Sequence, residues 1–425
     1  MKKVTRYYIC INQQTMNLYL RRVVVLLFTF VIVFGSAASC NFFDTAEPAA
    51  NLRYGILKND PKIYDKGYAF VNTVKNFKNN TISNGLGPQS GVKLIQLGKD
   101  RLAYISKNKG LFKTENGGRD WQRVYIYTLK ANSNAEFDQQ IAKNDELKIS
   151  DVSYFNNDNF YVSGIKNEIS YLFRTNDGGA SFTEVYNTEA NGKKVVIEQV
   201  LTEVKADRTN TVYISTSGGG IFRTDDAGSN WKNINIPNIT NDKPLQLGFL
   251  SQYDNRMFVL YRSAGLYLSE NGDTFTKKDV QFGKNSDNDY FFTNNARPDK
   301  IIQSKGSRDL IIIADKGIYI TSNLESEFKQ IKIPVEPTKI NISDIAIDPK
   351  EGVNRLILSA DNKLFESRDG GISWSVNDKI KQDKVAFGNI GTIIIDQDDS
   401  TVVYLMLIDP TYTRDDEYNL FNFGI

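Results

Sequence analysis

The stretch SRDGGISW, residues 367–374, contains the pattern that decides the fold of this chain. It places Ser367, Asp369, Gly371 and Trp374 at the first, third, fifth and eighth positions of one short segment. Ser or Thr and Asp or Asn side chains hydrogen-bond to nearby backbone amides in turns, and glycine adopts the positive φ that a tight turn requires. The pattern therefore predicts a hairpin turn held by its own side chains, with an aromatic ring directed between neighbouring sheets.

The same pattern recurs along the chain, and this motif is the basis of the fold prediction. The copies are Thr114-Asn116-Gly118-Trp121, Thr175-Asp177-Gly179-Phe182, Thr224-Asp226-Gly228-Trp231, Ser269-Asn271 with Phe275 one place early, Thr321-Asn323 with Glu325 in the glycine position and Phe328, Ser367-Asp369-Gly371-Trp374, and a weak match at Thr413-Asp415-Leu420. Successive copies start 61, 49, 45, 52, 46 and 46 residues apart. A period near fifty residues indicates one repeated unit, and four short strands need about that length.

Short apolar strands surround each copy, so the fold class is all-β. In the sixth repeat, strands are expected at residues 342–347, 355–360, 363–367 and 373–376, separated by turn residues. Seven copies predict a single seven-bladed β-propeller of four-stranded antiparallel sheets, with six blades as the alternative. A ring must close or leave sheet edges exposed. Residues 63–74 are expected to supply the closing strand, paired with residues 401–408.

These motifs resemble the Asp-box, or BNR, repeats of sialidases, xyloglucanase-type glycoside hydrolases, sortilin-type ectodomains and the photosystem II assembly factor. The resemblance covers most of the chain from Val92 onward. It implies a propeller with a sialidase-like fold, but the family contains both enzymes and binding proteins, so it does not decide the function.

The N-terminal segment has the pattern of an export signal. Arg21 and Arg22 precede an apolar run, residues 23–34, and the small residues 35–39 lead to Cys40. Cysteine directly after Ala-Ala-Ser resembles a bacterial lipobox, although Ala37 stands where that motif prefers leucine.

We therefore interpret residues 1–39 as a lipoprotein signal peptide, residues 40–58 as a lipidated Cys40 with a flexible tether, and residues 59–425 as the propeller. A plain signal peptide with an incidental cysteine is the alternative. The expected location is the bacterial cell envelope, with the protein anchored by lipid on the extracytoplasmic side of a membrane.

Charge and composition exclude several function classes. The formal net charge is +2, and five basic residues without any acid in the first 39 positions leave −3 for the rest, so no nucleic-acid surface is expected. The chain has no histidine, which excludes Ser-His-Asp and Cys-His catalysis. No cofactor and no metal site are predicted; Asn285–Asp289 offers oxygen ligands for calcium, but its spacing matches no defined site.

Two inserts between repeats are the candidates for partner contact. Both lie between a fourth strand and the next first strand, so they are expected on the face opposite the motif turns. The first, residues 130–146, is expected as a short helix or a mobile loop. The second, residues 283–299, is either a contact patch or an unplaced strand. Its candidate binding residues are Asp287, Asp289, Tyr290, Phe291, Phe292 and Arg297.

A catalytic role is tested against the enzymes that the motifs resemble. The resemblance to sialidases implies an Arg-Ile-Pro signature before the first motif, yet neither Arg53 nor Arg101 is followed by Ile-Pro. A xyloglucanase-like enzyme needs two facing carboxylates, and no pair is singled out. All three tryptophans belong to motifs. We therefore expect a non-catalytic module that binds another cell-envelope protein or a surface glycan, with a cell-surface glycoside hydrolase as the alternative.

Overall fold

The computed structural model divides the chain into two units, residues 1–49 and 50–425, and every described residue belongs to the second. The described residues are 55–59, 68–70, 74–76, 81–83, 91–106, 110–127, 134–189, 195–203, 210–239, 242–253, 256–278, 298–303, 308–314, 317–322, 324, 328–334, 342–361, 363–377 and 389–408. The predicted signal peptide, Cys40 and the weak motif at Thr413, Asp415 and Leu420 lie outside them.

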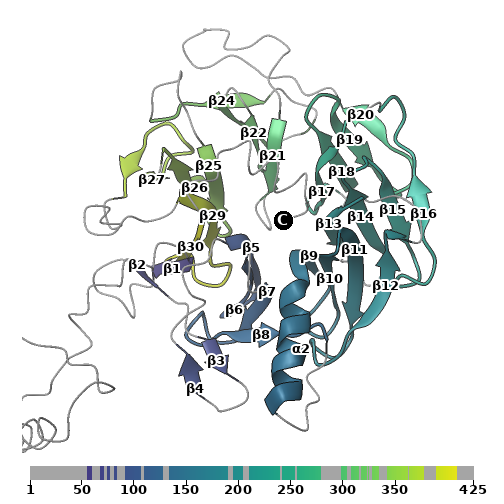
Figure 1. The fold of residues 1–425 in the computed structure, drawn as a ribbon. Coiled ribbons are helices and arrows are strands. Elements are labelled where there is room, and N and C mark those ends of the chain that lie inside the picture. Colours follow the sequence, from purple (N-terminus) through teal and green to yellow (C-terminus); the bar gives the residue numbers. More distant parts are fainter. Residues whose placement is uncertain are drawn as a thin grey trace, which may run out of the picture. The chain divides into compact units, whose positions relative to one another are not determined.

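Six four-stranded antiparallel sheets are each built from consecutive strands, and the first strand of each lies nearest the centre of a ring (Figure 1). Sheet 1 contains β5 (Gly91–Gly98), β6 (Arg101–Ser106), β7 (Gly110–Thr114) and β8 (Gln122–Val124). Sheet 2 contains β9 (Lys148–Tyr154), β10 (Phe160–Lys166), β11 (Ile169–Thr175) and β12 (Thr183–Asn187). Sheet 3 contains β13 (Ile197–Thr202), β14 (Val212–Thr216), β15 (Ile221–Thr224) and β16 (Lys232–Ile234).

The next three sheets repeat this arrangement. Sheet 4 contains β17 (Pro244–Leu250), β18 (Arg256–Tyr261), β19 (Gly265–Ser269) and β20 (Thr276–Lys278). Sheet 5 contains β21 (Pro298–Gln303), β22 (Leu310–Ala314), β23 (Gly317–Thr321) and β24 (Lys329–Ile331). Sheet 6 contains β25 (Ile342–Asp348), β26 (Gly352–Ala360), β27 (Lys363–Ser367) and β28 (Ser375–Val376). The four strands expected in the sixth repeat are confirmed to within a few residues at each end.

A further four-stranded sheet, sheet 7, is assembled from distant parts of the chain. Its strand order is β2-β1-β30-β29, from β1 (Gly55–Asn59), β2 (Tyr68–Phe70), β29 (Asn389–Ile395) and β30 (Val403–Ile408). A separate hairpin joins β3 (Val74–Asn76) and β4 (Thr81–Ser83). The prediction of an all-β propeller of four-stranded antiparallel sheets is confirmed.

The identity of the closing strand was predicted wrongly. The strand that pairs with β30 is β1, whose Leu57 lies opposite Leu405, and not a strand within residues 63–74. Within that range, β2 pairs only with β1, one place further out. Residues 55–58, assigned to a tether, therefore belong to a sheet. Pairing with an existing edge uses backbone groups, so a strand can form there without the apolar alternation that the sequence prediction required.

Apolar cores fill the spaces between successive sheets, and each core combines residues of two neighbours. The core between sheets 3 and 4, for example, combines Tyr213, Ile234, Met257 and Val259. The ring is continuous between sheets 7 and 1, because Leu94 and Trp121 of sheet 1 share a core with Tyr404 and Met406 of sheet 7.

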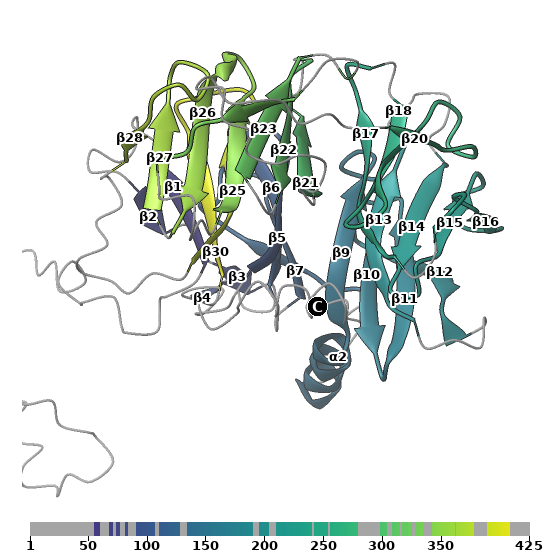
Figure 2. The same cartoon turned by 90° about the horizontal axis from the view of Figure 1, so that it is seen from above.

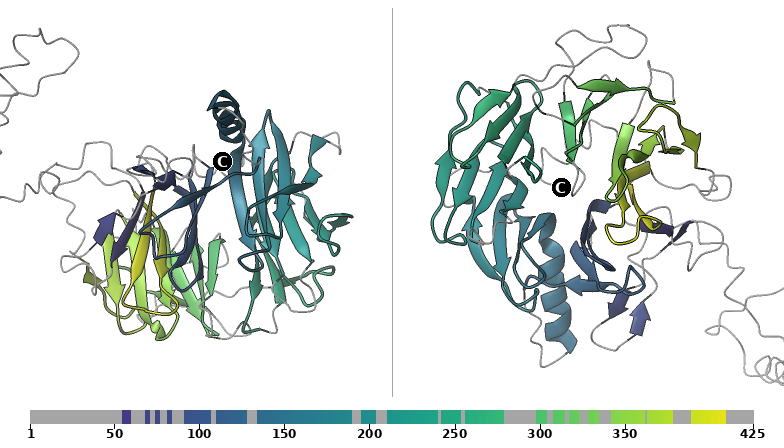
Figure 3. Two further views of the ribbon diagram at one scale, coloured as in Figure 1. Left: turned by 90° about the horizontal axis from the view of Figure 1, so that it is seen from below. Right: turned by 180° about the vertical axis from the view of Figure 1, so that it is seen from behind.

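The first insert is a helix, α2 (Asn134–Glu146), which connects β8 to β9. It projects from one face of the ring of sheets (Figures 2 and 3). We call this the link face, because links from a fourth strand to the next first strand emerge there. The motif turns connect third to fourth strands and lie on the opposite, or motif, face. Among the described residues, no helix has the length and apolar composition needed to cross a membrane.

Candidate functional site: the central channel and its polar ring

The motif residues form turns that their own side chains stabilise. In the third copy, Thr224 Oγ1 accepts hydrogen bonds from the backbone N of Asp226 (3.3 Å) and Gly228 (2.9 Å) and donates one to Asp226 Oδ1 (2.7 Å). Asp226 Oδ1 also accepts from Asn230 N at 2.8 Å. The copies that start at Thr114, Thr175 and Ser367 repeat these contacts.

The motif carboxylates are strong hydrogen-bond acceptors. The side chain of the residue four positions on, and then its backbone N–H, hold the pKa at about 2 for Asp177, Asp226 and Asp369. Hydrogen bonds to the ionised form favour that form, so these groups are charged and engaged at neutral pH. Such an acid is a turn-forming group and a poor proton donor.

Two degenerate copies keep part of this geometry. In the fourth, Ser269 Oγ accepts from Gly272 N at 2.8 Å, one residue earlier than in the other copies. That shorter turn explains why Phe275 comes one place early, and its ring is buried all the same. In the fifth, Thr321 and Phe328 are buried, whereas Asn323 and Glu325 lie outside the described residues.

The motif aromatics reach back to the preceding sheet. Trp231 Nε1 donates to Val185 O of sheet 2 at 3.2 Å, and Trp374 Nε1 donates to Lys332 O, in the segment after sheet 5, at 2.8 Å. Trp121 packs edge-on against Tyr104 in the core shared with sheet 7. The three tryptophans thus join adjacent repeats and are not available as a platform in the centre of the ring.

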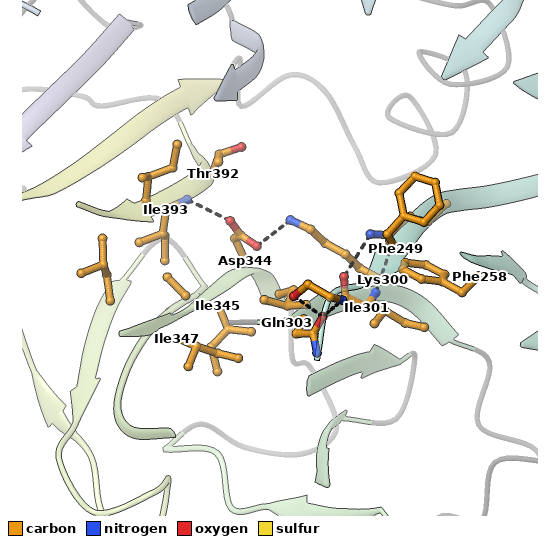
Figure 4. A pocket seen from close by; sticks show the side chains of 17 residues that line it. Phe249, Phe258, Lys300, Ile301, Gln303, Asp344, Ile345, Ile347, Thr392 and Ile393 are labelled. Carbon is orange, nitrogen blue, oxygen red and sulfur yellow. Dashed lines mark hydrogen bonds and ion pairs between the residues drawn. The ribbon is translucent and has the colours of Figure 1, made fainter. Parts of the chain in front are cut away.

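A cavity of about 500 Å³ lies among the first strands of sheets 4 to 7. Figure 4 shows its side chains, most of which come from β17, β21, β25 and β29, with Phe258 from β18. Phe249, Ile302, Ala346 and Ile394 contribute apolar surface to the wall. Because first strands face the axis, we call this cavity the central channel.

Seven residues at one equivalent position of the first strands form a polar ring, and Gln246, Lys300, Asp344 and Thr392 of this ring line the channel. Each of the seven strands has a register irregularity directly before this position. Such a bulge places an extra residue in one strand and re-aims a side chain. The polar ring consists of Lys93, Asp151, Gln199, Gln246, Lys300, Asp344 and Thr392.

Amides and carboxylates of the polar ring bind the backbone of the next sheet. Asp151 Oδ2 accepts from Val200 N at 2.7 Å. Gln246 Oε1 accepts from Ile301 N at 2.8 Å, and its Nε2 donates to the carbonyl of the same residue at 3.0 Å. Gln199 bonds to two residues of β17, where its Oε1 accepts from Leu247 N at 2.7 Å and its Nε2 donates to Leu245 O. Each of these ring residues therefore cross-links two neighbouring first strands.

Two ion pairs complete these cross-links. Lys300 Nζ lies 2.8 Å from Asp344 Oδ1, and Asp344 Oδ2 accepts from Ile393 N at 2.8 Å, so one carboxylate connects sheets 5, 6 and 7 (Figure 4). Lys93 pairs with Asp151 in the same way between sheets 1 and 2. The cross-link between sheets 7 and 1 is made by Gln96, which is not a member of the polar ring. Its Oε1 accepts a hydrogen bond from Gln397 N at 3.1 Å.

One buried carboxylic acid beside the polar ring has a raised pKa. Glu198 precedes Gln199 on β13 and is 8% exposed. Burial raises its pKa to about 7, and the ammonium of Lys243 opposes this shift. Among the described residues, no group of three or more Cys, Asp or Glu side chains is placed to hold a metal ion.

The predicted contact patch cannot be compared with the ring. Asp287, Asp289, Tyr290, Phe291, Phe292 and Arg297 lie outside the described residues. The insert was also drawn too long, because Pro298 and Asp299 belong to β21, where Asp299 accepts from Arg262 at 3.0 Å. The sequence analysis missed the polar ring. The available signal was a polar residue followed directly by an apolar one in every first strand, such as Lys300-Ile301 and Asp344-Ile345.

The fold and the ring define this chain as a β-propeller, and comparisons with known proteins agree. No family model and no curated protein matches the sequence. Among solved structures it is similar to YCF48 bound to D1 peptide (16% identity, 76% of this chain and 92% of that one, TM-score 0.51). It is similar to YCF48 from Cyanidioschyzon merolae (16% identity, 75% and 97%, TM-score 0.51).

The chain is also similar to a hydrolase. The GH74 enzyme of Niastella koreensis has 14% identity and a TM-score of 0.55 over 75% of this chain. This chain spans about half of that enzyme, since 51% of it is covered. At such low identities these likenesses show the fold and no more.

Proposed function

We propose that this chain is a non-catalytic binding or assembly module of the bacterial cell envelope, with the propeller as its rigid scaffold. The observation that carries the proposal is the state of Asp344. This carboxylate lines the central channel, and both of its oxygens are engaged, one by Lys300 and the other by the backbone of sheet 7. A glycosidase needs two carboxylates free to act on either side of a sugar.

The partner we propose is another cell-envelope protein or a surface glycan, bound at the link face. This face carries α2, and the polar ring lies near the link-face ends of the first strands. Functional residues occur disproportionately on segments that a rigid scaffold positions. The similarity to a propeller solved with a peptide bound supports a protein partner.

Lipid on Cys40 is the proposed attachment to the membrane. A single short acyl chain gives only marginal binding, whereas several chains anchor stably, at about 0.8 kcal/mol per buried CH₂.

The hydrogen-bond pattern of the turn motifs, described above, supports their assignment to the Asp-box repeats.

The test is affinity capture of the full chain from membranes in mild detergent, followed by mass spectrometry, which also reports the acyl group on Cys40. We expect one envelope partner to be enriched, and a Gly/Ser replacement of residues 283–296 to reduce its recovery at least tenfold with an unchanged Tm. The matched control replaces the exposed motif-face residue Ile372 by Ser and should retain the partner. Equal recovery with both variants would contradict binding through this insert.

A glycoside hydrolase is the second candidate, and Glu198 is the observation that favours it. A carboxyl group with a pKa near 7 has the protonation expected of a general acid. The test is release of reducing sugar from xyloglucan and a panel of other glycans. Activity that Glu198→Gln abolishes would establish the hydrolase and overturn the non-catalytic proposal; no activity in the unaltered protein supports the binding module.

A further inference from the structure

The two ion pairs of the polar ring expose the ammonium group and bury the carboxylate. The side chain of Lys300 is 43% exposed, whereas that of Asp344 is 3% exposed. In the other pair, Lys93 is 39% exposed and Asp151 is 5% exposed. Each aspartate is also bound by a backbone N–H of the next sheet, which holds its charge away from solvent. Each pair is therefore a dipole whose positive end is the part that a ligand can reach.

One of these pairs belongs to the cavity. Lys300 and Asp344 line the central channel, whereas Lys93 and Asp151 are not among the residues that line it. The ammonium group of Lys300 has three N–H donors, and Asp344 Oδ1 accepts from it at 2.8 Å. Within the described part of the chain Asp344 is its one hydrogen-bond partner, so two donors remain for a ligand.

A hydroxyl group lies close to this ammonium. Asp344 binds Lys300 through one oxygen and Ile393 N through the other, and Thr392 directly precedes Ile393 on β29 (Figure 4). The side chain of Thr392 is half-buried and lines the same cavity. Its hydroxyl can donate one hydrogen bond. The ammonium and the hydroxyl thus form a pair of donors at the rim of the channel.

The wall next to this pair of donors is apolar. Side chains alternate along a strand, so the residue two positions after each ring residue also faces the axis. These places are held by Ile302, Ala346 and Ile394 in sheets 5, 6 and 7, and Phe249 of sheet 4 adds an aromatic ring. The volume of about 500 Å³ lies within the range of small-molecule sites. A ligand that fits has an apolar body and a hydrogen-bond acceptor at one end.

The acceptor that suits this rim carries one negative charge. The exposed ammonium favours an anion, but Asp344 already balances it, so a phosphate dianion would bring two further negative charges beside a buried carboxylate. A carboxylate brings one charge. Its two oxygens match the two kinds of donor, the ammonium of Lys300 and the hydroxyl of Thr392.

We propose that the central channel binds a small organic acid with an apolar body. Lys300 and Thr392 hold its carboxylate at the rim, and the body packs against the apolar wall. This site goes beyond the proposed function, because its ligand is a small molecule and its test needs no envelope partner.

Isothermal titration calorimetry of the full chain in mild detergent tests the class of ligand, with phenylbutyrate as the probe. We expect saturable binding in the millimolar range or tighter. Phenylbutanol keeps the apolar body but has a neutral hydroxyl in place of the carboxylate, so it should bind at least tenfold more weakly. Butyrate keeps the carboxylate but lacks the aromatic ring, and it should also bind at least tenfold more weakly.

Variants of two ring lysines locate the site. Lys300→Met keeps the apolar stem and removes the charge, so it should weaken phenylbutyrate binding at least tenfold and leave phenylbutanol binding unchanged. The matched control is Lys93→Met, at a ring lysine with the same kind of ion pair outside the cavity, which should keep its affinity within a few-fold. Lys300→Arg keeps the charge and should likewise stay within a few-fold.

Three results would overturn the proposal. They are no saturable binding of phenylbutyrate, equal binding of phenylbutanol, or an equal loss of affinity in Lys300→Met and Lys93→Met. If Lys300→Met lowers Tm because Asp344 loses its partner, Thr392→Val replaces it. This variant keeps the shape and removes the hydroxyl, so it should weaken phenylbutyrate binding several-fold without affecting phenylbutanol. An unchanged affinity for phenylbutyrate in Thr392→Val would then contradict the site.

Discussion

The hydroxyl group of Thr224 serves three partners at once, and this explains why the first motif position is Ser or Thr. It accepts from two backbone N–H groups and donates to Asp226, while the side chain is almost fully buried. A hydroxyl supplies one donor and two acceptor sites, so all three are used. Valine has the same shape but none of these groups.

Thr224→Val should therefore destabilise the protein by about 1–3 kcal/mol, the cost of leaving buried polar groups without a partner. Urea denaturation followed by tryptophan fluorescence measures the change. Thr183→Val is the control, because Thr183 is an exposed residue on β12. A loss for Thr224→Val no larger than for Thr183→Val would show that the hydroxyl is not what holds the turn.

Glu198 predicts how stability depends on pH. Its pKa is about 7 in the folded protein, above the ordinary value near 4.3 expected in the unfolded chain. Between about pH 4 and pH 7 the Glu198 carboxyl is protonated in the folded state but ionised in the unfolded chain. The contribution of this carboxyl to the free energy of unfolding is therefore full below about pH 4 and is lost as pH rises through 7. Glu198→Gln should remove that loss and raise the free energy of unfolding at pH 8 by about 1–3 kcal/mol.

Measuring the free energy of unfolding of the unaltered protein and of Glu198→Gln at pH 4.5 and pH 8 checks this prediction. The gain from Glu198→Gln should appear at pH 8 and be nearly absent at pH 4.5. Glu351→Gln, at an exposed position in the turn after β25, serves as the control and should show no such difference. A gain of equal size at both pH values would mean that the carboxyl does not titrate as its burial predicts.

At the scale of the strand, the repeated bulge explains how seven sheets remain in register around an axis. Inner strands cannot hydrogen-bond to one another as neighbours in one sheet do, because each belongs to a different sheet. The bulge turns one side chain toward the adjacent inner strand, and that side chain supplies the missing bond, as Gln246 does for Ile301. The polar ring thus holds neighbouring sheets in register, and part of it also lines the channel.

Asp344→Ala should lower the free energy of unfolding by about 1–3 kcal/mol, because Ile393 N–H is buried and loses its acceptor. The Lys300 ammonium adds less, since it is 43% exposed and water screens it. The matched variant is Thr392→Ala, where the link between sheets 7 and 1 is made by Gln96 and Gln397 instead. Thermal and urea unfolding should show the larger loss for Asp344→Ala; the reverse order would argue against the cross-linking role.

The turns and strands could be predicted from sequence because their chemistry is local. Thr224, Asp226 and Gly228 define a turn within five residues, and the strands around them follow from apolar runs. The polar ring could not be predicted in this way, because Asp151 and Val200 are 49 positions apart and meet only in the closed ring. The predicted contact residues Asp287 to Arg297 remain a prediction, since they lie outside the described residues.

At the scale of the whole molecule, closure of the ring depends on β1. Its backbone pairs with β30 on one side and with β2 on the other, so it is a central strand of sheet 7. A loop-closing contact between residues 57 and 405 costs chain entropy, but it removes an exposed strand edge next to an apolar core. Residues 55–59 therefore belong to the folding unit of the propeller and not to a tether.

Leu57→Pro tests this closure, because proline cannot donate to a ladder and is excluded from central strands. The variant should lose about 3 kcal/mol or more, a value taken from proline in other regular structure, and should expose the edge of β30 to pairing with other molecules. Urea unfolding measures the first effect and light scattering the second. Leu57→Val keeps strand propensity and should behave like the unaltered protein. If Leu57→Pro unfolded at the same urea concentration as the unaltered protein and stayed monomeric, β1 would not be needed for closure. The apolar core around Tyr404, which sheets 7 and 1 share, would then close the ring without it.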